Sequence, residues 1–186
     1  MKTIETQALI CLLISIFSGY IQAQTINYFN QDPPGKIPVK FAEGFISKPN
    51  IEEICPIFTP DGKEFYYTEL DDQDWTYFKV MVLKYIEGKW TTPVEANLPG
   101  KQFEVGCCFS PDGNTMFYSC AASDWDIDMY RMERTVDGWD PAVKLSDQIN
   151  GIGSAIATSV SSDSILYFRS SIGAWNSGKM DLFFSK

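Results

Sequence analysis

A segment of about fifty residues recurs along this chain, and a repeat of that length restricts the fold to architectures that stack one supersecondary unit several times. The stretch 53–67 matches the stretch 105–118, each with Pro-Asp-Gly before an aromatic-rich run, and the stretch 156–168 matches more loosely. Three sets of landmarks keep a step of 49 to 51 residues along the chain. They are Asp61, Asp112 and Asp163; Trp75, Trp125 and Trp175; and Trp90 and Trp139.

Each unit is predicted to form four antiparallel strands, which we call a to d. Strand a ends at Phe58 or Phe109, and Pro-Asp-Gly then supplies a tight turn, because proline fixes φ and glycine accepts the left-handed conformation. Aromatic and β-branched residues favour strand b at 64–68, 115–120 and 165–170, and strand c at 77–85, 128–133 and 181–185. Trp90 and Trp139 lead into strand d and are expected to pack between units.

Three motifs resemble the repeat of TolB-like β-propellers, which are related to WD repeats. They are Phe-Ser-Pro-Asp-Gly ending at Gly113, Asp-Met-Tyr ending at Tyr130, and Gly-Trp-x-Pro-x-x-x-Leu ending at Leu145. The resemblance covers residues 37–186 and implies an all-β propeller of four-stranded antiparallel blades. It implies no single function, because such blades occur in periplasmic scaffolds, in exported cell-wall proteins and beside peptidase or glycan-active domains. The third unit departs from the pattern, since residues 161–164 include neither proline nor glycine.

The expected domain order is a signal peptide at 1–23, a linker at 24–36 and a partial β-propeller at 37–186. Residues 1–7 are polar, 8–17 are apolar and 18–23 are small or polar, which is the order of regions in a secretory signal. The apolar run is shorter than the roughly 20 residues of a membrane-spanning helix. We therefore expect cleavage near Ala23 and export to the periplasm or the outside of the cell, with an uncleaved N-terminal anchor as the alternative.

Within residues 37–186 we expect an orphan strand d at 37–46, a blade at 51–98, a second blade at 103–149 and an incomplete blade at 154–186. These segments supply about three blades, whereas propellers usually have four to eight. The chain is therefore expected to be a fragment of a larger, six-bladed ring, or else to form a homodimer in which two copies complete the ring.

Composition excludes several classes of function. The formal net charge of −9 repels phosphate backbones and anionic lipid head groups, so nucleic acid and membrane surfaces are not expected partners. No segment after the signal peptide is long and apolar enough to form an integral membrane span. The chain contains no histidine, which excludes Ser-His-Asp and Cys-His catalysis and the usual zinc sites.

Four cysteines follow the predicted signal peptide: Cys55, Cys107, Cys108 and Cys120. Four cysteines permit three complete pairings, and their spacing does not choose among them. Cys107 and Cys108 are neighbours and are expected to point to opposite faces of one strand. We therefore expect small apolar strand residues with at most one disulfide.

The candidate ligand-binding residues lie in the loops between strands b and c. Each loop carries a tryptophan, two of them also carry several carboxylates, and the repeat places all three loops on one rim of a propeller. An indole ring covers the apolar face of a sugar while aspartates accept hydrogen bonds from its hydroxyls, so the pattern is typical of glycan recognition. The alternative is that each tryptophan caps its own blade. The candidate residues are Trp75, Trp125, Trp175, Asp74, Asp124 and Asp126.

Calcium is a second interpretation of one of these loops, because Asp124, Asp126 and Asp128 alternate and offer hard oxygen ligands. The glycine and the distal glutamate of a helix-flanked calcium loop are absent, and Asp128 aligns with Asp181 at the start of strand c. We therefore favour a structural role and expect no metal, no cofactor and no catalytic residue.

Two functions remain after these exclusions. The first is an exported, non-catalytic binding or scaffold module that recognises a glycan or protein ligand through the loop tryptophans and carboxylates. The alternative is the propeller part of a glycan-active or peptidase enzyme whose catalytic region is absent from this chain. We favour the first, because no two carboxylates stand out as the pair that glycoside hydrolysis needs.

Overall fold

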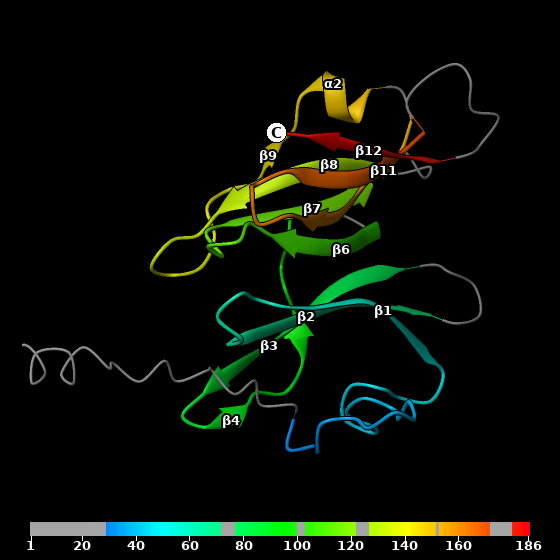
Figure 1. The fold of residues 1–186 in the computed structure, drawn as a ribbon, viewed down its shortest axis with the longest axis vertical. Coiled ribbons are helices and arrows are strands. Elements are labelled where there is room, and N and C mark those ends of the chain that lie inside the picture. Colours follow the sequence, from blue (N-terminus) through cyan, green and yellow to red (C-terminus); the bar gives the residue numbers. More distant parts are fainter. Residues whose placement is uncertain (1–28, 72–76, 100–102, 122–126, 152, 172–179) are drawn as a thin grey trace, which may run out of the picture.

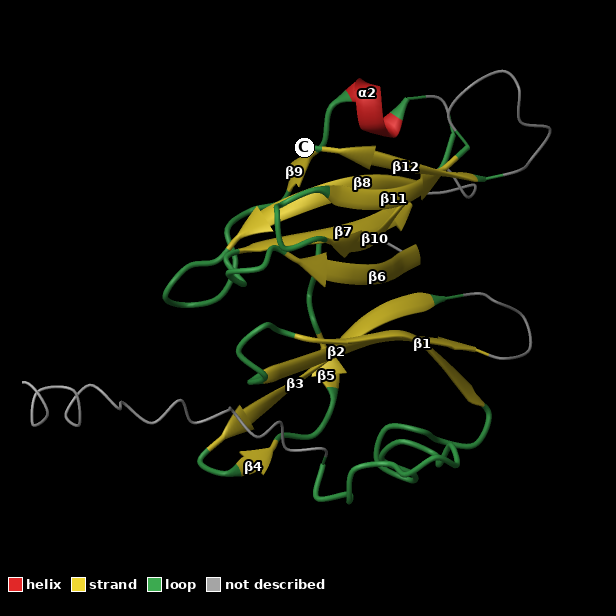
Figure 2. Cartoon of the chain, viewed as in Figure 1, coloured by secondary structure: helices red, strands yellow, loops and turns green. Residues whose placement is uncertain are grey.

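A computed structural model of the chain describes residues 29–71, 77–99, 103–121, 127–151, 153–171 and 180–186 (Figure 1). Strands make up nearly all of the regular structure in these ranges (Figure 2). The helix that they contain, α2 (Asp147–Asn150), is a single turn that has no counterpart in the sequence prediction. The predicted all-β class is confirmed.

The strands form three units that follow one another along the chain. Unit 1 comprises β1 (Ile51–Phe58), β2 (Glu64–Asp71), β3 (Phe78–Ile86), β4 (Lys89–Trp90) and β5 (Val94–Glu95). Unit 2 comprises β6 (Phe103–Phe109), β7 (Thr115–Ala121), β8 (Ile127–Glu133) and β9 (Val143–Lys144). Unit 3 comprises β10 (Ala155–Val160), β11 (Leu166–Ser170) and β12 (Asp181–Ser185).

Each unit is an antiparallel sheet in the order a-b-c, as the sequence predicts. The short strands β5 and β9 add strand d to β3 and β8, whereas the described residues place no strand on the outer edge of β12. A single parallel pair, Phe78 with Phe103, joins units 1 and 2, and unit 3 forms a separate sheet. The a strands lie side by side, because β6 packs against both β1 and β10 (Figure 2).

The turn between strands a and b begins in the same way in all three units, although it closes one residue earlier in unit 3, where the N–H of Ser161 donates to the carbonyl oxygen of Ile165. A hydroxyl donates a hydrogen bond of 2.6 Å to the repeat aspartate in each: Thr59 to Asp61, Ser110 to Asp112 and Ser161 to Asp163. The next residue has left-handed φ, at 68° for Gly62, 73° for Gly113 and 64° for Ser164. Unit 3 thus forms the turn without proline or glycine, because the side-chain hydrogen bond holds the aspartate in place.

Strand a carries a β-bulge in each unit, shown by register shifts between Ile54 and Ile57, between Val105 and Cys107, and between Ala157 and Ser159. Gly106 in this bulge has a φ of 57°, and Cys55 at the equivalent place in β1 has a φ of 54°. A Cβ atom on Gly106 would lie 3.2 Å from the Cβ atom of Cys55. Strands β1 and β6 therefore approach so closely at their bulges that glycine suits this position in β6.

The side chains of the neighbouring residues Cys107 and Cys108 lie in two different cores, because consecutive side chains of a strand point to opposite faces of the sheet. Cys107 lies in the core between units 1 and 2, and Cys108 lies in the core between units 2 and 3. Burial raises the pKa of the Cys108 thiol to about 12 and that of Cys120 to about 11, so both are neutral at physiological pH. Cys55, in contrast, is exposed.

The expectation of an outer strand at 37–46 is wrong. This segment forms turns with one isolated bridge between Glu43 and Ser47. It buries Ala42 and Ile46 in a cluster with Phe65 and Leu83, so it covers an end of unit 1 rather than extending a sheet. The side chains of Ala42 and Ile46 pack against aromatic residues of unit 1. The free energy gained by burying these side chains exceeds the strand propensity of Ile37 and Val39.

Trp139 packs between units, as predicted. Its ring stacks on Phe109 of unit 2, with centroids 6.1 Å apart, and its Nε1 donates to the hydroxyl of Tyr66 in unit 1 at 3.4 Å. Trp90 is the equivalent residue of unit 1 and stacks on Phe29, with centroids 4.5 Å apart. The segment before unit 1 therefore supplies the aromatic contact that a preceding unit supplies to Trp139.

Candidate ligand-binding site

The loops between strands b and c are anchored along one edge of the molecule, which we call the loop edge. It is defined by the last pairs of strands b and c: Leu70 with Phe78, Ala121 with Ile127, and Ser170 with Asp181. The ends of β2, β7 and β11 that carry these pairs lie at the right-hand side of the ribbon in Figure 1. The equivalent ends of the three units therefore face the same way.

Contacts between units hold the loop edge together. The first two strand pairs, Leu70 with Phe78 and Ala121 with Ile127, belong to one buried apolar cluster that also contains Ile156 of unit 3. Between units 2 and 3, the N–H of Ile127 donates to Oγ of Ser154 at 3.4 Å. Within unit 3, the N–H of Ser154 donates to Oγ of Ser171 at 2.9 Å. Anchor residues of all three loops are thus connected.

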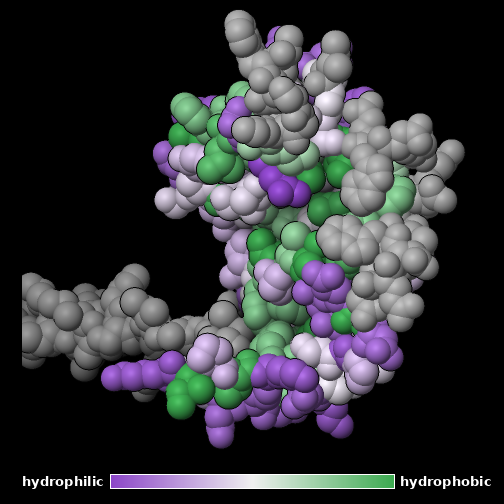
Figure 3. Space-filling view, turned by 90° about the vertical axis from the view of Figure 1, so that its right-hand side faces the viewer, coloured by the Kyte–Doolittle hydropathy of each residue, from purple (hydrophilic) through white to green (hydrophobic). Residues whose placement is uncertain are grey.

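The six predicted ligand-binding residues lie outside the described residues. Positions 72–76 include Asp74 and Trp75, positions 122–126 include Asp124, Trp125 and Asp126, and positions 172–179 include Trp175. The described residues show where these three loops begin and end, and these positions lie side by side on the loop edge. Figure 3 views this edge face on, with hydrophobic residues gathered along its middle and hydrophilic residues at its lower end.

Gly153 allows the chain that enters unit 3 to pass close to Ser171 at the loop edge. Its φ is 116°, and a Cβ atom there would lie 2.4 Å from Oγ of Ser171 and 3.3 Å from the Ser171 carbonyl oxygen. Both the backbone conformation and the close approach require glycine. The sequence analysis did not single out Gly153, because its role depends on a neighbour 18 positions away.

Glu104 is a buried carboxyl group next to the loop edge. The residue is 5% exposed, and its Oε2 accepts a hydrogen bond from the N–H of Val80 in unit 1 at 3.1 Å. Burial raises the pKa of Glu104 to about 7, while the Val80 hydrogen bond and Lys79 lower it and Glu95 raises it. The sequence gives no signal for this group, because an acidic residue in a strand usually faces solvent.

The a strands line a cavity of about 430 Å³ on the side of the molecule where β1, β6 and β10 meet. Its walls are mostly apolar, with Ile54, Val105 and Ile156 among them, and Arg169 is its charged residue. The thiol of Cys55 also lies here. Burial raises its pKa and Arg169 lowers it, with a net increase, so the thiol is not activated as a nucleophile.

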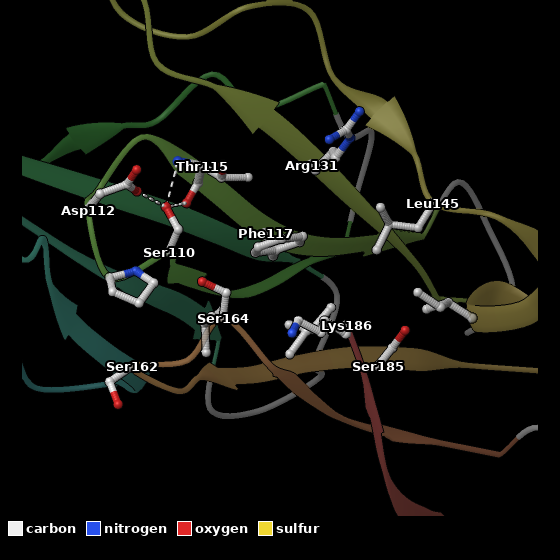
Figure 4. Close-up of a pocket in the computed structure, with 14 residues that line it drawn as sticks. Ser110, Asp112, Thr115, Phe117, Arg131, Leu145, Ser162, Ser164, Ser185 and Lys186 are labelled. Atoms are coloured by element: carbon white, nitrogen blue, oxygen red, sulfur yellow. Dashed lines mark hydrogen bonds between the residues drawn. The ribbon is translucent and has the colours of Figure 1, made fainter.

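A larger cavity, of about 570 Å³, lies between units 2 and 3, and we call it the inter-unit cavity (Figure 4). Phe117, Leu145, Ile149, Val160 and Leu166 give it an apolar lining. Polar and charged groups surround this lining: Ser110, Asp112, Arg131, Ser162, Ser164 and Lys186. Apolar walls with a few polar groups at the rim are typical of a site for an amphipathic ligand.

The described residues do not build a metal centre, since nowhere among them do three or more His, Cys, Asp or Glu side chains gather closely enough to hold an ion. Asp128, the third aspartate of the alternating series, forms an ion pair of 2.7 Å with Lys144 in strand d. This contact gives Asp128 the structural role that its alignment with Asp181 indicates.

Comparisons with known proteins give a similarity to a solved structure but no family. No family model matches the sequence, and no curated protein matches it. Among solved structures, the chain is similar to TolB from Acinetobacter baumannii, with a TM-score of 0.45 and 20% identity, over 72% of this chain and 29% of that chain. The chain thus spans less than a third of the length of that TolB structure. Within the described part of the chain, no helix is long and apolar enough to cross a membrane.

Proposed function

We propose that this chain is an exported, non-catalytic β-propeller module that binds a glycan or protein ligand at the loop edge. The observation that carries the proposal is the connection of all three loop anchors by one apolar cluster and the Ser154 hydrogen bonds. The connected anchors support the proposal that one ligand contacts more than one of the three tryptophan-bearing loops.

The placement of the a strands supports the propeller arrangement. In a propeller the first strand of each blade lies nearest the axis, and the a strands here lie side by side around a common apolar cavity. Three antiparallel units, each with an aspartate turn after strand a and a bulge within it, are equivalent blades in this arrangement. A larger ring, or two copies of the chain, would complete it.

The chemistry of the loops favours a carbohydrate. An indole ring packs on the apolar face of a sugar, and the carboxylates of Asp74, Asp124 and Asp126 accept hydrogen bonds from its hydroxyls. Where a protein is the ligand, the same tryptophans serve as buried anchors of an interface.

A glycan array followed by titration tests this proposal. We expect binding to change tryptophan fluorescence, and we expect Trp125→Ala to weaken it by about 1 to 3 kcal/mol, the range for a central aromatic anchor, with the far-ultraviolet circular dichroism unchanged. Tyr167→Ala is the matched control, because Tyr167 is an exposed aromatic in the middle of β11. A ligand that binds wild type and Trp125→Ala equally, or a Trp125→Ala protein that unfolds, would show that the loop tryptophans are structural.

Export is tested separately, by expressing the chain with residues 1–23 and sequencing the N-terminus of the processed product. The expected product begins close to residue 24. Retention of the full chain in the cytoplasm would contradict export without affecting the binding measurement.

A further inference from the structure

We propose that Cys55 of β1 and Cys107 of β6 form a disulfide bridge that ties unit 1 to unit 2 beside the cavity of the a strands. The structure holds both residues as free thiols, so the bridge is the oxidised form of this pair. Such a bridge involves neither the loop edge nor a ligand. Export, which belongs to the proposed function, would supply the oxidising compartment in which disulfides persist.

The backbone brings the two cysteines to the same point of the interface. A Cβ atom on Gly106 would lie 3.2 Å from the Cβ atom of Cys55 and 3.3 Å from its Sγ. Cys107 is the next residue along β6, and consecutive Cα atoms are about 3.8 Å apart. The Cα atoms of a disulfide are usually about 4.4 to 6.8 Å apart, a separation that this approach of the two strands allows.

Both cysteines also line one cavity. It is the cavity of about 430 Å³ where β1, β6 and β10 meet. The side chain of Cys107 belongs to the core between units 1 and 2, so it faces the unit that carries Cys55. The cavity gives the two sulfur atoms space to turn toward each other at its wall.

The ionisation of the thiols agrees with this proximity. Burial raises the pKa of Cys107, and the neighbouring thiols of Cys108 and Cys55 raise it further. Burial also raises the pKa of Cys55, although Arg169 lowers it. Both thiols are therefore mostly protonated at neutral pH, so the bridge is expected to form slowly there and faster in alkaline solution.

Strand geometry excludes the other two cysteines of the described residues as partners. Cys108 points to the opposite face of β6, into the core between units 2 and 3. Cys107 pairs with Tyr118, which lies two positions before Cys120 in β7. Diagonal neighbours of this kind are roughly 7 to 8 Å apart, which is more than a disulfide spans.

The bridge forms by two thiol–disulfide exchanges with an oxidised small thiol such as oxidised glutathione. The thiolate of the exposed Cys55 attacks one sulfur of the oxidant, whose S–S bond breaks, and one glutathione thiolate leaves. The Cys107 thiolate then attacks Sγ of Cys55 and displaces the second glutathione. Two protein thiols lose two electrons and two protons, and one glutathione disulfide becomes two thiols.

The bridge joins units that few strand contacts connect. Among the described residues, one parallel pair, Phe78 with Phe103, links the sheets of units 1 and 2. A crosslink between residues far apart in the sequence restricts the unfolded chain and thereby stabilises the folded one. Oxidation is therefore expected to raise the melting temperature by roughly 5 °C or more.

The test incubates the purified full chain at about pH 8.5 with reduced and oxidised glutathione, because thiolates are the reacting species. Remaining thiols are blocked with iodoacetamide, and the disulfides are mapped by mass spectrometry after trypsin digestion. Trypsin leaves Cys55 on peptide 41–63 and the cysteines 107, 108 and 120 on peptide 102–131. We expect these two peptides to be joined, with fragmentation assigning the partner as Cys107.

Single variants provide an independent assignment. In Cys107→Ala we expect no joined peptides, one glutathione retained on Cys55, and no change of melting temperature on bridge formation. Cys108→Ala and Cys120→Ala are the matched controls, because both remove another buried cysteine, and both are expected to form the bridge as wild type does. Circular dichroism checks that each variant folds, and fragmentation of the wild-type peptides does not depend on any variant.

Two results would overturn the proposal: a Cys55 that stays unpaired under these conditions, or one that pairs with a cysteine other than Cys107. A bridge that leaves the melting temperature unchanged would contradict its role in holding units 1 and 2 together. None of these results bears on ligand binding at the loop edge or on processing of the N-terminus, so failure here and failure of the proposed function are distinguishable.

Discussion

The side chain of Thr68 in β2 accepts a hydrogen bond from the backbone N–H of Gly106 in β6, with Oγ1 and N 3.0 Å apart. The same bond recurs 51 residues later, where Oγ of Ser119 accepts from the N–H of Ala157 at 2.9 Å. Thr68 and Ser119 are both fully buried. A hydroxyl of strand b in one unit thus accepts a hydrogen bond from a backbone N–H at or next to the bulge of strand a in the following unit.

Thr68→Val tests this bond between units. Valine has nearly the shape of threonine but cannot accept a hydrogen bond, so the N–H of Gly106 is left buried without its partner. We expect a loss of about 1 to 3 kcal/mol in the free energy of unfolding, measured by urea denaturation. Thr92→Val at an exposed position is the control and is expected to change stability by less than about 0.5 kcal/mol. Equal effects of the two substitutions would contradict a role for the bond.

Glu104 is expected to make stability depend on pH near neutrality. Its pKa is raised from the ordinary 4.5 to about 7 in the folded protein, so the folded state holds a proton that the unfolded chain releases. Its contribution is therefore fully present below about pH 4.5 and is lost as pH rises through about 7. Glu104→Gln keeps the acceptor for Val80 and removes the titration.

We expect the stability of wild type relative to Glu104→Gln to fall by about 1 to 3 kcal/mol between about pH 5 and about pH 8. The measurement is urea denaturation across this range, with Glu52→Gln at an exposed position as the control. Parallel pH profiles of wild type and Glu104→Gln would show that Glu104 titrates normally.

Ser164 is expected to limit the stability of unit 3. It adopts a φ of 64°, which glycine accepts at no steric cost and which the equivalent Gly62 and Gly113 already adopt. We predict that Ser164→Gly raises the free energy of unfolding by about 0.5 to 1 kcal/mol. Gly113→Ala, the reverse change in unit 2, is expected to lower it by at least as much. A higher melting temperature for Ser164→Gly and a lower one for Gly113→Ala are the observable results.

Glu64 and Arg134 form an ion pair across the interface of units 1 and 2. Nη2 of Arg134 lies 2.8 Å from Oε2 of Glu64, and the guanidinium lies 4.2 Å from the centroid of the Trp139 ring. Arg134→Met leaves the mostly buried Glu64 with Lys84 at 3.4 Å as its remaining cation. We expect a loss of about 1 to 3 kcal/mol, smaller than for a fully buried pair because Arg134 is partly exposed.

A double-mutant cycle with Glu64→Gln measures the coupling of this pair. The matched control is Arg131→Met, because Arg131 is exposed and lies 3.4 Å from Glu133, a surface pair expected to contribute less than about 0.5 kcal/mol. Additive effects of Arg134→Met and Glu64→Gln would mean that the two side chains act independently.

Local sequence patterns were sufficient to predict the units. The period of the landmarks placed the three units, and the Pro-Asp-Gly turns placed the boundary between strands a and b at Phe58 and Phe109, where the structure ends β1 and β6. Such features depend on residues within a few positions of one another, because turn dihedrals and side-chain alternation are local properties. The candidate binding residues came from the same pattern, and their loops lie outside the described residues.

Tertiary structure alone decided how the units meet. The sequence of residues 37–46 favours a strand, but its apolar groups pack on unit 1 instead. Thr68 and Gly106 are 38 residues apart and Glu64 and Arg134 are 70 apart, so no local pattern shows that they are partners. The bulge of strand a, the burial of Glu104 and the cavity beside Phe117 likewise arise where two units pack together. A repeat specifies its own strands through neighbouring residues, whereas the contacts between units depend on which side chains face each other once the sheets have formed.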